Sequence, residues 1–214
     1  MGGFGGFPLA GLDLYEDLEV DNSKAFWTAH KHVYEQAVRE PMLALTAELE
    51  AEFGPAKLFR PYRDVRFSHD KSPYKTHQGA VAGTAPGVGW YVQIGAPGLF
   101  VSGGFYRGDA EQIASLRRAV ADEVRGPELE SILAPLAAAG YVLGGERLKT
   151  RPKGYDADHP RIGLLRHKSL TCSREFGAPA WLSTPKAAEH VRQAWTDLRP
   201  LVEWLTAVVG PANA

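Results

Sequence analysis

Three short strand-like runs joined by tight turns constrain the fold of this chain more than any other feature of its sequence. Residues 78–84, 90–95 and 99–105 are rich in Val, Ile and aromatic side chains, which favour extended backbone. Two short segments containing Pro and Gly, 85–89 and 96–98, separate the runs and favour reversal of the chain. The pattern therefore predicts an antiparallel β-meander.

Apolar residues with helical spacing precede the meander. One amphipathic segment spans 12–18, a second follows the capping cluster Asp21-Asn22-Ser23, and a third ends at Gly54-Pro55. Glu40-Pro41 is predicted to end the second helix and to start the third. The first third of the chain is thus expected to be helical.

Helices are also predicted after the meander. Asp109 and Gln112 have the spacing of a capping box, which indicates a helix that begins at residue 109. A second helix is predicted over 128–139, and a long helix from about residue 185 to residue 209. Further short strands are predicted over 141–143, 147–150 and 169–175.

Hairpin-linked strands with helices before and after them are typical of α+β proteins, because doubly wound folds alternate strand and helix throughout. We therefore expect an α+β fold. Its antiparallel β-sheet, with a meander core, would be flanked by N-terminal helices, a central helix pair and a long C-terminal helix. No internal repeat divides the 214 residues, so a single domain over residues 1–214 is predicted.

Composition excludes several classes of protein. The hydrophobic share of 44% and the charged share of 23% are typical of folded globular chains. The net charge of −1 gives no overall attraction to nucleic acid or to acidic lipid. With one cysteine, Cys172, no internal disulfide can form, and neither a signal sequence nor a membrane-spanning run is recognisable. A cytoplasmic location without membrane partners is therefore expected.

The segment from Arg60 to Thr76 is the strongest candidate for chemistry. Its seventeen residues hold five Lys or Arg and two Asp. Guanidinium groups bind phosphate or carboxylate through paired N–H donors, and a neighbouring carboxylate can orient one of them. The segment therefore predicts an oxyanion site. Its predicted ligand-binding residues are Arg60, Arg63, Asp64, Arg66, Ser68, Lys71 and Lys75.

Two residues of the same segment can transfer protons. Asp70 and Tyr74 are the predicted catalytic acid or base if the chain is an enzyme, which the sequence leaves open. The alternative is structural, because Arg63, Asp64 and Arg66 can equally form salt bridges that pin a long loop.

A second cationic stretch spans residues 144–168 and contains seven Lys or Arg. If it folds over the first segment, its side chains can complete one pocket. A solvated charged loop is the alternative. The residues predicted to join the pocket are Lys149, Arg151, Arg166 and Lys168.

Metal ligands of the right atom types occur, for example at Asp156, Asp158 and His159. They do not have the spacing of a known metal motif, so no metal site is predicted. The sequence indicates no particular cofactor.

Several motifs resemble those of one family. The long run Phe59 to Thr76 is the most specific of them, and Asp21-Asn22-Ser23-Lys24, Glu40-Pro41 and Lys153-Gly154-Tyr155 add to it. Together they resemble the family catalogued as domain of unknown function 2461, over nearly the whole chain. The order Phe26-Trp27 departs from the family pattern, as does Asp21. The resemblance implies a soluble, single-domain bacterial or fungal protein, and it supplies no catalytic residues.

Two classes of function remain open at this stage. The first is binding, or enzymatic handling, of a small phosphate-bearing molecule. The second is a non-catalytic module that contacts nucleic-acid backbone or another protein, in which the Arg/Asp cluster is structural. A near-neutral total charge disfavours nucleic acid as the partner. The sequence does not indicate an oligomeric state.

Overall fold

The computed structural model describes residues 3–66 and 70–210. The chain divides into two compact units. The first comprises the described residues of 1–82 together with Tyr91–Val101 and Glu175–Gln193. The second comprises Gly83–Trp90, Ser102–Arg174 and the described residues of 194–214. The prediction of a single domain stays a prediction.

The expected N-terminal helices are present: α1 (Leu9–Val20), α2 (Lys24–Tyr34) and α3 (Glu40–Phe53). The Ser23 side chain accepts a hydrogen bond from the backbone N–H of Phe26 at 3.1 Å and caps α2. Gly54, with φ of 81°, ends α3 because this backbone conformation suits glycine. The predictions of both helix ends are confirmed.

The predicted break at Glu40-Pro41 is instead a widened turn. A π-helical segment, η1 (Glu35–Arg39), joins α2 to α3 without a loop. Proline lacks an N–H and its ring crowds the carbonyl four residues earlier, which is Ala37 here. A π-turn relieves that crowding, and Pro41 then lies in the first turn of α3. A Cβ at Gly11 would lie 2.7 Å from the Ala37 carbonyl oxygen, so glycine lets α1 pack closely here.

The β-meander is confirmed as β2 (His77–Ala85), β3 (Val88–Gly95) and β4 (Gly98–Phe105). With β1 (Ala56–Leu58), β5 (Val142–Gly144) and β6 (Leu170–Gly177), these strands form one sheet in the order β1-β2-β3-β4-β6-β5. The strands are antiparallel, and the chain has an α+β fold. Strand β1, which the sequence did not reveal, pairs with β2 in the register Leu58 to Ala80. Strands β2, β3, β4 and β6 contribute residues to both units.

Two further predicted strands are confirmed as β5 (Val142–Gly144) and β6 (Leu170–Gly177), which pair antiparallel. The predicted strand over 147–150 is wrong, because only an isolated bridge joins Arg147 to His167. The backbone N–H groups of Lys168 and Ser169 both reach the carbonyl of Glu146, at 2.7 and 3.4 Å, which interrupts the regular ladder.

The second unit contains α4 (Ala110–Ala121), α5 (Arg125–Ala138) and the short α6 (Ile162–Leu165). The predicted capping box is confirmed, since Asp109 accepts from the N–H of Gln112 and Gln112 accepts from that of Asp109. The long helix α7 (Lys186–Val209) begins in the first unit and ends in the second. In the second unit it packs on β4, where a Cβ at Gly103 would lie 3.2 Å from Leu198.

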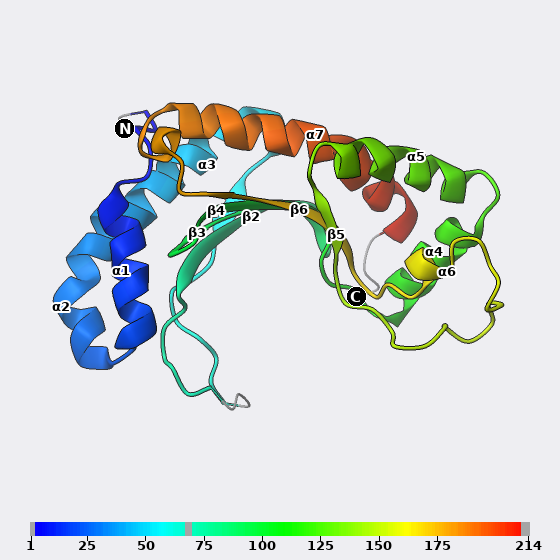
Figure 1. The fold of residues 1–214 in the computed structure, drawn as a ribbon, viewed down its shortest axis with the longest axis horizontal. Helices are drawn as coiled ribbons and strands as arrows, with labels where there is room; N and C mark the ends of the chain where they lie inside the picture. Colours follow the sequence, from blue (N-terminus) through cyan, green and yellow to red (C-terminus); the bar gives the residue numbers. More distant parts are fainter. Residues whose placement is uncertain (1–2, 67–69, 211–214) are drawn as a thin grey trace. The chain divides into compact units, whose positions relative to one another are not determined.

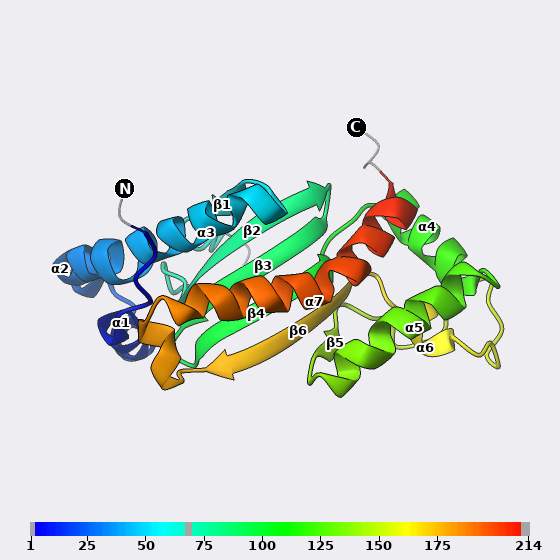
Figure 2. The same cartoon turned by 90° about the horizontal axis from the view of Figure 1, so that it is seen from above.

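In the first unit, helices cover one face of the strands. Figures 1 and 2 show α3 and the start of α7 lying along this face, while the chain between β1 and β2 extends from the other side. Burial alternates accordingly along the strands. Val92, Ile94, Leu99 and Val101 are at most 1% exposed. Their neighbours Tyr91, Gln93 and Phe100, which alternate with them, are partly exposed.

Candidate functional site

The chain between β1 and β2 folds back on itself as a hairpin-like segment, residues 60–76, which we call the cationic loop. At its base the Arg63 N–H donates to the Pro73 carbonyl at 2.9 Å, and the Lys75 N–H donates to the Pro61 carbonyl at 2.8 Å. Residues 67–69 lie outside the described part of the chain, and with them the predicted ligand-binding Ser68.

An aromatic cluster supports the base of the cationic loop. Tyr74, which is 5% exposed, stacks on Trp27 with ring centroids 4.4 Å apart and planes 14° apart. Tyr62 forms an isolated β-bridge with Tyr74, with their rings 5.5 Å apart, and Tyr34 lies 4.9 Å from the Trp27 ring. These contacts fix the loop to α2 through side chains of large buried area.

Asn22 also holds the base of the loop. Its side-chain oxygen accepts from the N–H of Tyr74 at 2.9 Å, and its amide donates to the carbonyl of Tyr74 at 3.2 Å. One side chain thus satisfies both backbone groups of a residue that makes no regular strand. Asn22 was part of the capping cluster in the sequence, where nothing indicated this second role.

Both arginines around Asp64 are ion-paired, rather than one being left free. Arg66 forms a two-point contact with Asp64, at 2.9 Å from Nε and 2.6 Å from Nη2. Its hydrogen bonds hold the pKa of the Asp64 carboxyl below its usual value. Arg63 pairs with Asp70 instead. The Arg66 side chain is 77% exposed, and pairs this exposed contribute little to stability.

Lys71 lies within the loop but is committed to its backbone, because its ammonium donates to the Val65 carbonyl at 3.0 Å. This contact shapes the loop and leaves fewer donors for a ligand.

Three cations gather near the base of the loop: Arg60, Arg63 and Lys75, which we call the cationic cluster. Burial lowers the pKa of Lys75, and the charges of Arg60 and Arg63 lower it further. Among the described residues, the ion pairs of the cluster involve one carboxylate, that of Asp70. Positive charge is therefore in excess here, which favours an anionic ligand.

The pKa values of the two predicted catalytic residues, Asp70 and Tyr74, shift in opposite directions. Hydrogen bonds from Ser72, together with the charge of Arg63, hold the pKa of Asp70 below its usual value. Burial, followed by the nearby Tyr62, raises the pKa of Tyr74. Both shifts move the pKa away from neutral, which makes Asp70 a weaker base and Tyr74 a weaker acid near pH 7. Their catalytic role stays a prediction.

The free energy of unfolding should decrease at acidic pH because of His77 and His167. Burial lowers the pKa of both, and the charges of Lys75 and Arg63 lower that of His77 further. In the folded state these imidazoles bind fewer protons than in the unfolded state. Their contribution to the free energy of unfolding is therefore complete above about pH 6.5 and is lost as the pH falls below that value. We expect urea denaturation to show lower stability at pH 5.5 than at 7.5. His77→Gln should reduce this difference, and an unchanged difference would contradict the assignment.

In the second cationic stretch, the predicted ligand-binding side chains contact their own segment. Arg166 donates to the carbonyls of Leu148 at 2.8 Å and Lys149 at 2.7 Å. Arg151 donates to the Tyr155 carbonyl at 2.7 Å, and Lys168 pairs with Glu146 at 2.5 Å. The side chain of Lys149 is exposed. These contacts favour a structural role for Arg151, Arg166 and Lys168.

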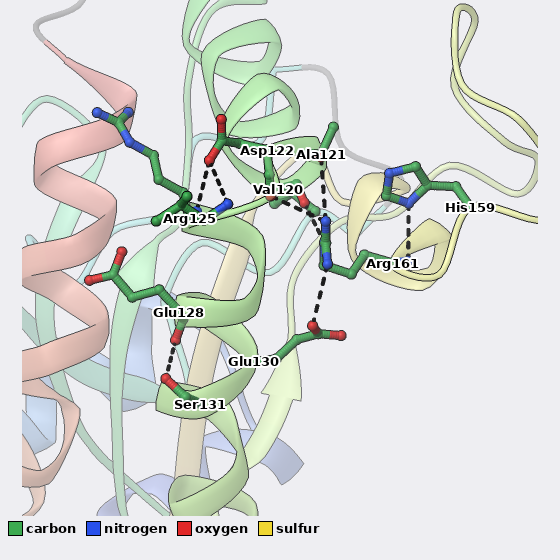
Figure 3. Close-up of polar contacts among 10 residues, drawn as sticks. Val120, Ala121, Asp122, Arg125, Glu128, Glu130, Ser131, His159 and Arg161 are labelled. Atoms are coloured by element: carbon green, nitrogen blue, oxygen red, sulfur yellow. Dashed lines mark hydrogen bonds and ion pairs between the residues drawn. The ribbon is translucent and has the colours of Figure 1, made fainter.

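Arg161 of the same stretch anchors it to the junction of α4 and α5 (Figure 3). Its Nε donates to the Val120 carbonyl at 2.7 Å, and its Nη2 to the carbonyls of Ala121 and Asp122 at 3.4 and 3.2 Å. Cations bound at a helix C-terminus complement the helix dipole and its unpaired carbonyls. The sequence showed the charge of Arg161 but not this use.

The two cationic stretches fall in different compact units, the first in unit one and the second in unit two. The prediction that Lys149, Arg151, Arg166 and Lys168 complete one pocket with the cationic loop therefore stays a prediction.

The sequence did not indicate the partly exposed face of the meander. Phe59, Tyr91 and Phe100 form a continuous row there, with Phe59 and Tyr91 ring centroids 6.2 Å apart and Tyr91 and Phe100 also 6.2 Å apart. Lys75 lies over the Phe59 ring at 5.2 Å. Aromatic residues in strands usually belong to the core. Only the polar Gln93, two residues after Tyr91 and therefore on the same face of the sheet, could have indicated an accessible face.

Other features of the described chain lie apart from the cationic loop. A groove of about 820 Å³ separates the N-terminal segment from α3, and none of the predicted site residues line it. Among the described residues, no group of three or more His, Cys, Asp or Glu is placed to hold a metal ion. No described helix has the length and apolarity required to cross a membrane.

Comparison with known protein families identifies the family of this chain. The model of the family described as "Conserved hypothetical protein (DUF2461)" matches residues 10–204. The chain belongs to this family. No curated protein and no solved structure matches it. The match includes every predicted site residue of this DUF2461 chain, and the family's description assigns it no activity.

Proposed function

We propose that this chain binds a small molecule carrying phosphate or another oxyanion at the cationic cluster of Arg60, Arg63 and Lys75. The observation that carries this function is the positive excess at the base of the loop, where three cations repel one another and their ion pairs among the described residues involve only the carboxylate of Asp70. A bound oxyanion would relieve that repulsion.

The cluster is held in place before any ligand binds. Hydrogen bonds from Arg63 and Lys75 backbone N–H groups close the base of the loop, and Tyr74 is fixed by Trp27 and Asn22. These contacts fix the backbone from which the donors extend, so less conformational entropy is lost on binding, which favours affinity.

The cluster is also accessible. Arg60 is exposed, and the Arg63 side chain is 31% exposed although it is paired with Asp70. A guanidinium has five N–H donors, so one contact with a carboxylate leaves others for a ligand. In an enzymatic form of this function, Asp70 or Tyr74 would be the acid or base beside the bound anion.

We also propose a cytoplasmic location. It is supported by the single cysteine, Cys172, which is buried and forms no disulfide.

Thermal unfolding with and without inorganic phosphate tests the anion site. The wild type should be stabilised, by about 2.7 kcal/mol at a ligand concentration one hundred times the dissociation constant. Lys75→Met should lose most of this stabilisation without becoming less stable by itself, because the lysine it removes is repelled by its neighbours. Lys186→Met makes the same change at an exposed residue of α7 and should respond to phosphate as the wild type does.

Two results would oppose the proposal. One is a wild type whose unfolding does not respond to phosphate, pyrophosphate or simple phosphate esters. The other is equal binding by Lys75→Met and wild type. A large loss of stability in unliganded Lys75→Met would instead support the structural interpretation of the loop.

A further inference from the structure

One face of the meander is covered by α3 and the start of α7 (Figure 1), and the residues that alternate with the buried ones point to its other face. Phe59, Tyr91 and Phe100 lie on it as one row. The planes of Phe59 and Tyr91 differ by 34°, and those of Tyr91 and Phe100 by 67°. All three are partly exposed. Because neighbouring rings are inclined to each other, a flat molecule can stack on one ring of this aromatic platform and contact the edge of the next.

Gly79 leaves room for the Tyr91 ring at the centre of this platform. The Phe59 N–H donates to the Gly79 carbonyl at 3.0 Å, which places the two residues side by side on neighbouring strands. A Cβ at Gly79 would lie 2.3 Å from the Tyr91 hydroxyl and 2.6 Å from its ring. The Tyr91 ring therefore leans across the strand over Gly79, and any larger residue there would displace it.

The platform and the cationic cluster meet at Lys75. Its ammonium lies 5.2 Å from the centroid of the Phe59 ring, so the cation is beside the end of the aromatic row. A ligand whose anionic group binds Lys75 would therefore have its remaining atoms next to Phe59, at the end of the row that continues through Tyr91 to Phe100.

Gln93 adds a polar group to the same face. Its side-chain oxygen accepts a hydrogen bond from the Tyr91 hydroxyl at 2.7 Å, which orients the amide. Its amide nitrogen makes no hydrogen bond among the described residues, so its two N–H donors can bind the edge of a heteroaromatic ring. Such a group gives specificity to a site that is otherwise apolar.

We infer that the ligand is a mononucleotide, with its phosphate at the cationic cluster and its base packed against Tyr91 and Phe100. This inference rests on the proposed anion site and names its ligand class. Each part of a nucleotide has a matching group here: cations for the phosphate, rings for the base, and the Gln93 amide for the base edge. A single-stranded nucleic acid shares this chemistry but needs a longer positive track, and the net charge of the chain is −1.

Binding of three ligands with the same phosphate chemistry tests the inference: inorganic phosphate, ribose 5-phosphate and adenosine 5′-monophosphate. Calorimetry of the wild type should give at least about fivefold tighter binding of the nucleotide than of the sugar phosphate, because base stacking on aromatic side chains is worth about 1–3 kcal/mol. Phe100→Leu and Tyr91→Leu should each reduce this preference while leaving the affinity for ribose 5-phosphate unchanged. Phe26→Leu, on α2, is the control and should keep the preference.

The outcomes separate the two proposals. Equal binding of the nucleotide and the sugar phosphate would overturn the nucleotide while leaving the anion site standing. Failure of all three ligands to bind would overturn both. Much tighter binding of a single-stranded oligonucleotide, with steep salt dependence, would show that the ligand is single-stranded nucleic acid and would overturn the mononucleotide. Nuclear Overhauser contacts between base protons and the ring of Phe100 would support the inference directly.

Discussion

Trp27→Ala should lower the free energy of unfolding by about 3–5 kcal/mol, the usual range for removing a buried aromatic side chain. Trp27 is 3% exposed and packs between Tyr34 and Tyr74, at 4.9 and 4.4 Å. Since Tyr74 immediately precedes Lys75, the variant should also weaken phosphate binding. Urea denaturation monitored by circular dichroism measures the first effect, and calorimetry measures the second.

Phe26→Ala is the matched control. Phe26 precedes Trp27 on α2 but is partly exposed and stacks on His30 at 4.1 Å. Its replacement should cost about 1 kcal/mol or less. Similar losses for the two variants would mean that the contact with Tyr74 does not carry the stability assigned to it.

Gln78→Leu should cost about 2–4 kcal/mol, because one buried amide satisfies three groups. Its oxygen accepts from the Tyr34 hydroxyl at 2.7 Å, and its nitrogen donates to the carbonyls of Phe59 and Gly79, each at 2.8 Å. Gln78 is 1% exposed, so water cannot easily replace it. A buried polar group left without a partner costs about 1–3 kcal/mol.

The same substitution at Gln36, an exposed residue of η1, should change stability by less than about 0.5 kcal/mol. A double variant, Tyr34→Phe with Gln78→Leu, should lose less than the sum of the two single losses, because it leaves no unpaired phenol. Strict additivity in urea denaturation would show that the two side chains do not depend on each other.

Local chemistry explains why many elements could be predicted. Helix ends were predicted correctly where a side chain or glycine acts on backbone only a few residues away, as at Ser23, at Gly54 and at the pair Asp109 and Gln112. Such effects can be recognised from the sequence alone. The meander could also be predicted from the sequence, because its strands are joined by short turns. The interrupted ladder after β5 was not, because it depends on how Glu146 meets Lys168 and Ser169 across 22 and 23 positions.

The candidate site divides in the same way. The sequence identified the charged loop and the type of ligand that suits it, since those follow from the residue types present. It did not reveal that Arg66 is held by Asp64 while Arg63 pairs with Asp70, seven residues away. It also did not reveal that the cations of the second stretch bind their own backbone, as Arg166 does.

By itself, the sequence determined the α+β class, the family and the concentration of positive charge between residues 60 and 76, because these depend on local propensity, motif and composition. Only the tertiary structure decided which cations remain in excess, and that Lys75 lies beside the row from Phe59 to Phe100. The reason is physical. Ion pairing and ring packing depend on distances between strands, and pairing of β1 with β2 and of β3 with β4 sets those distances through contacts remote along the chain.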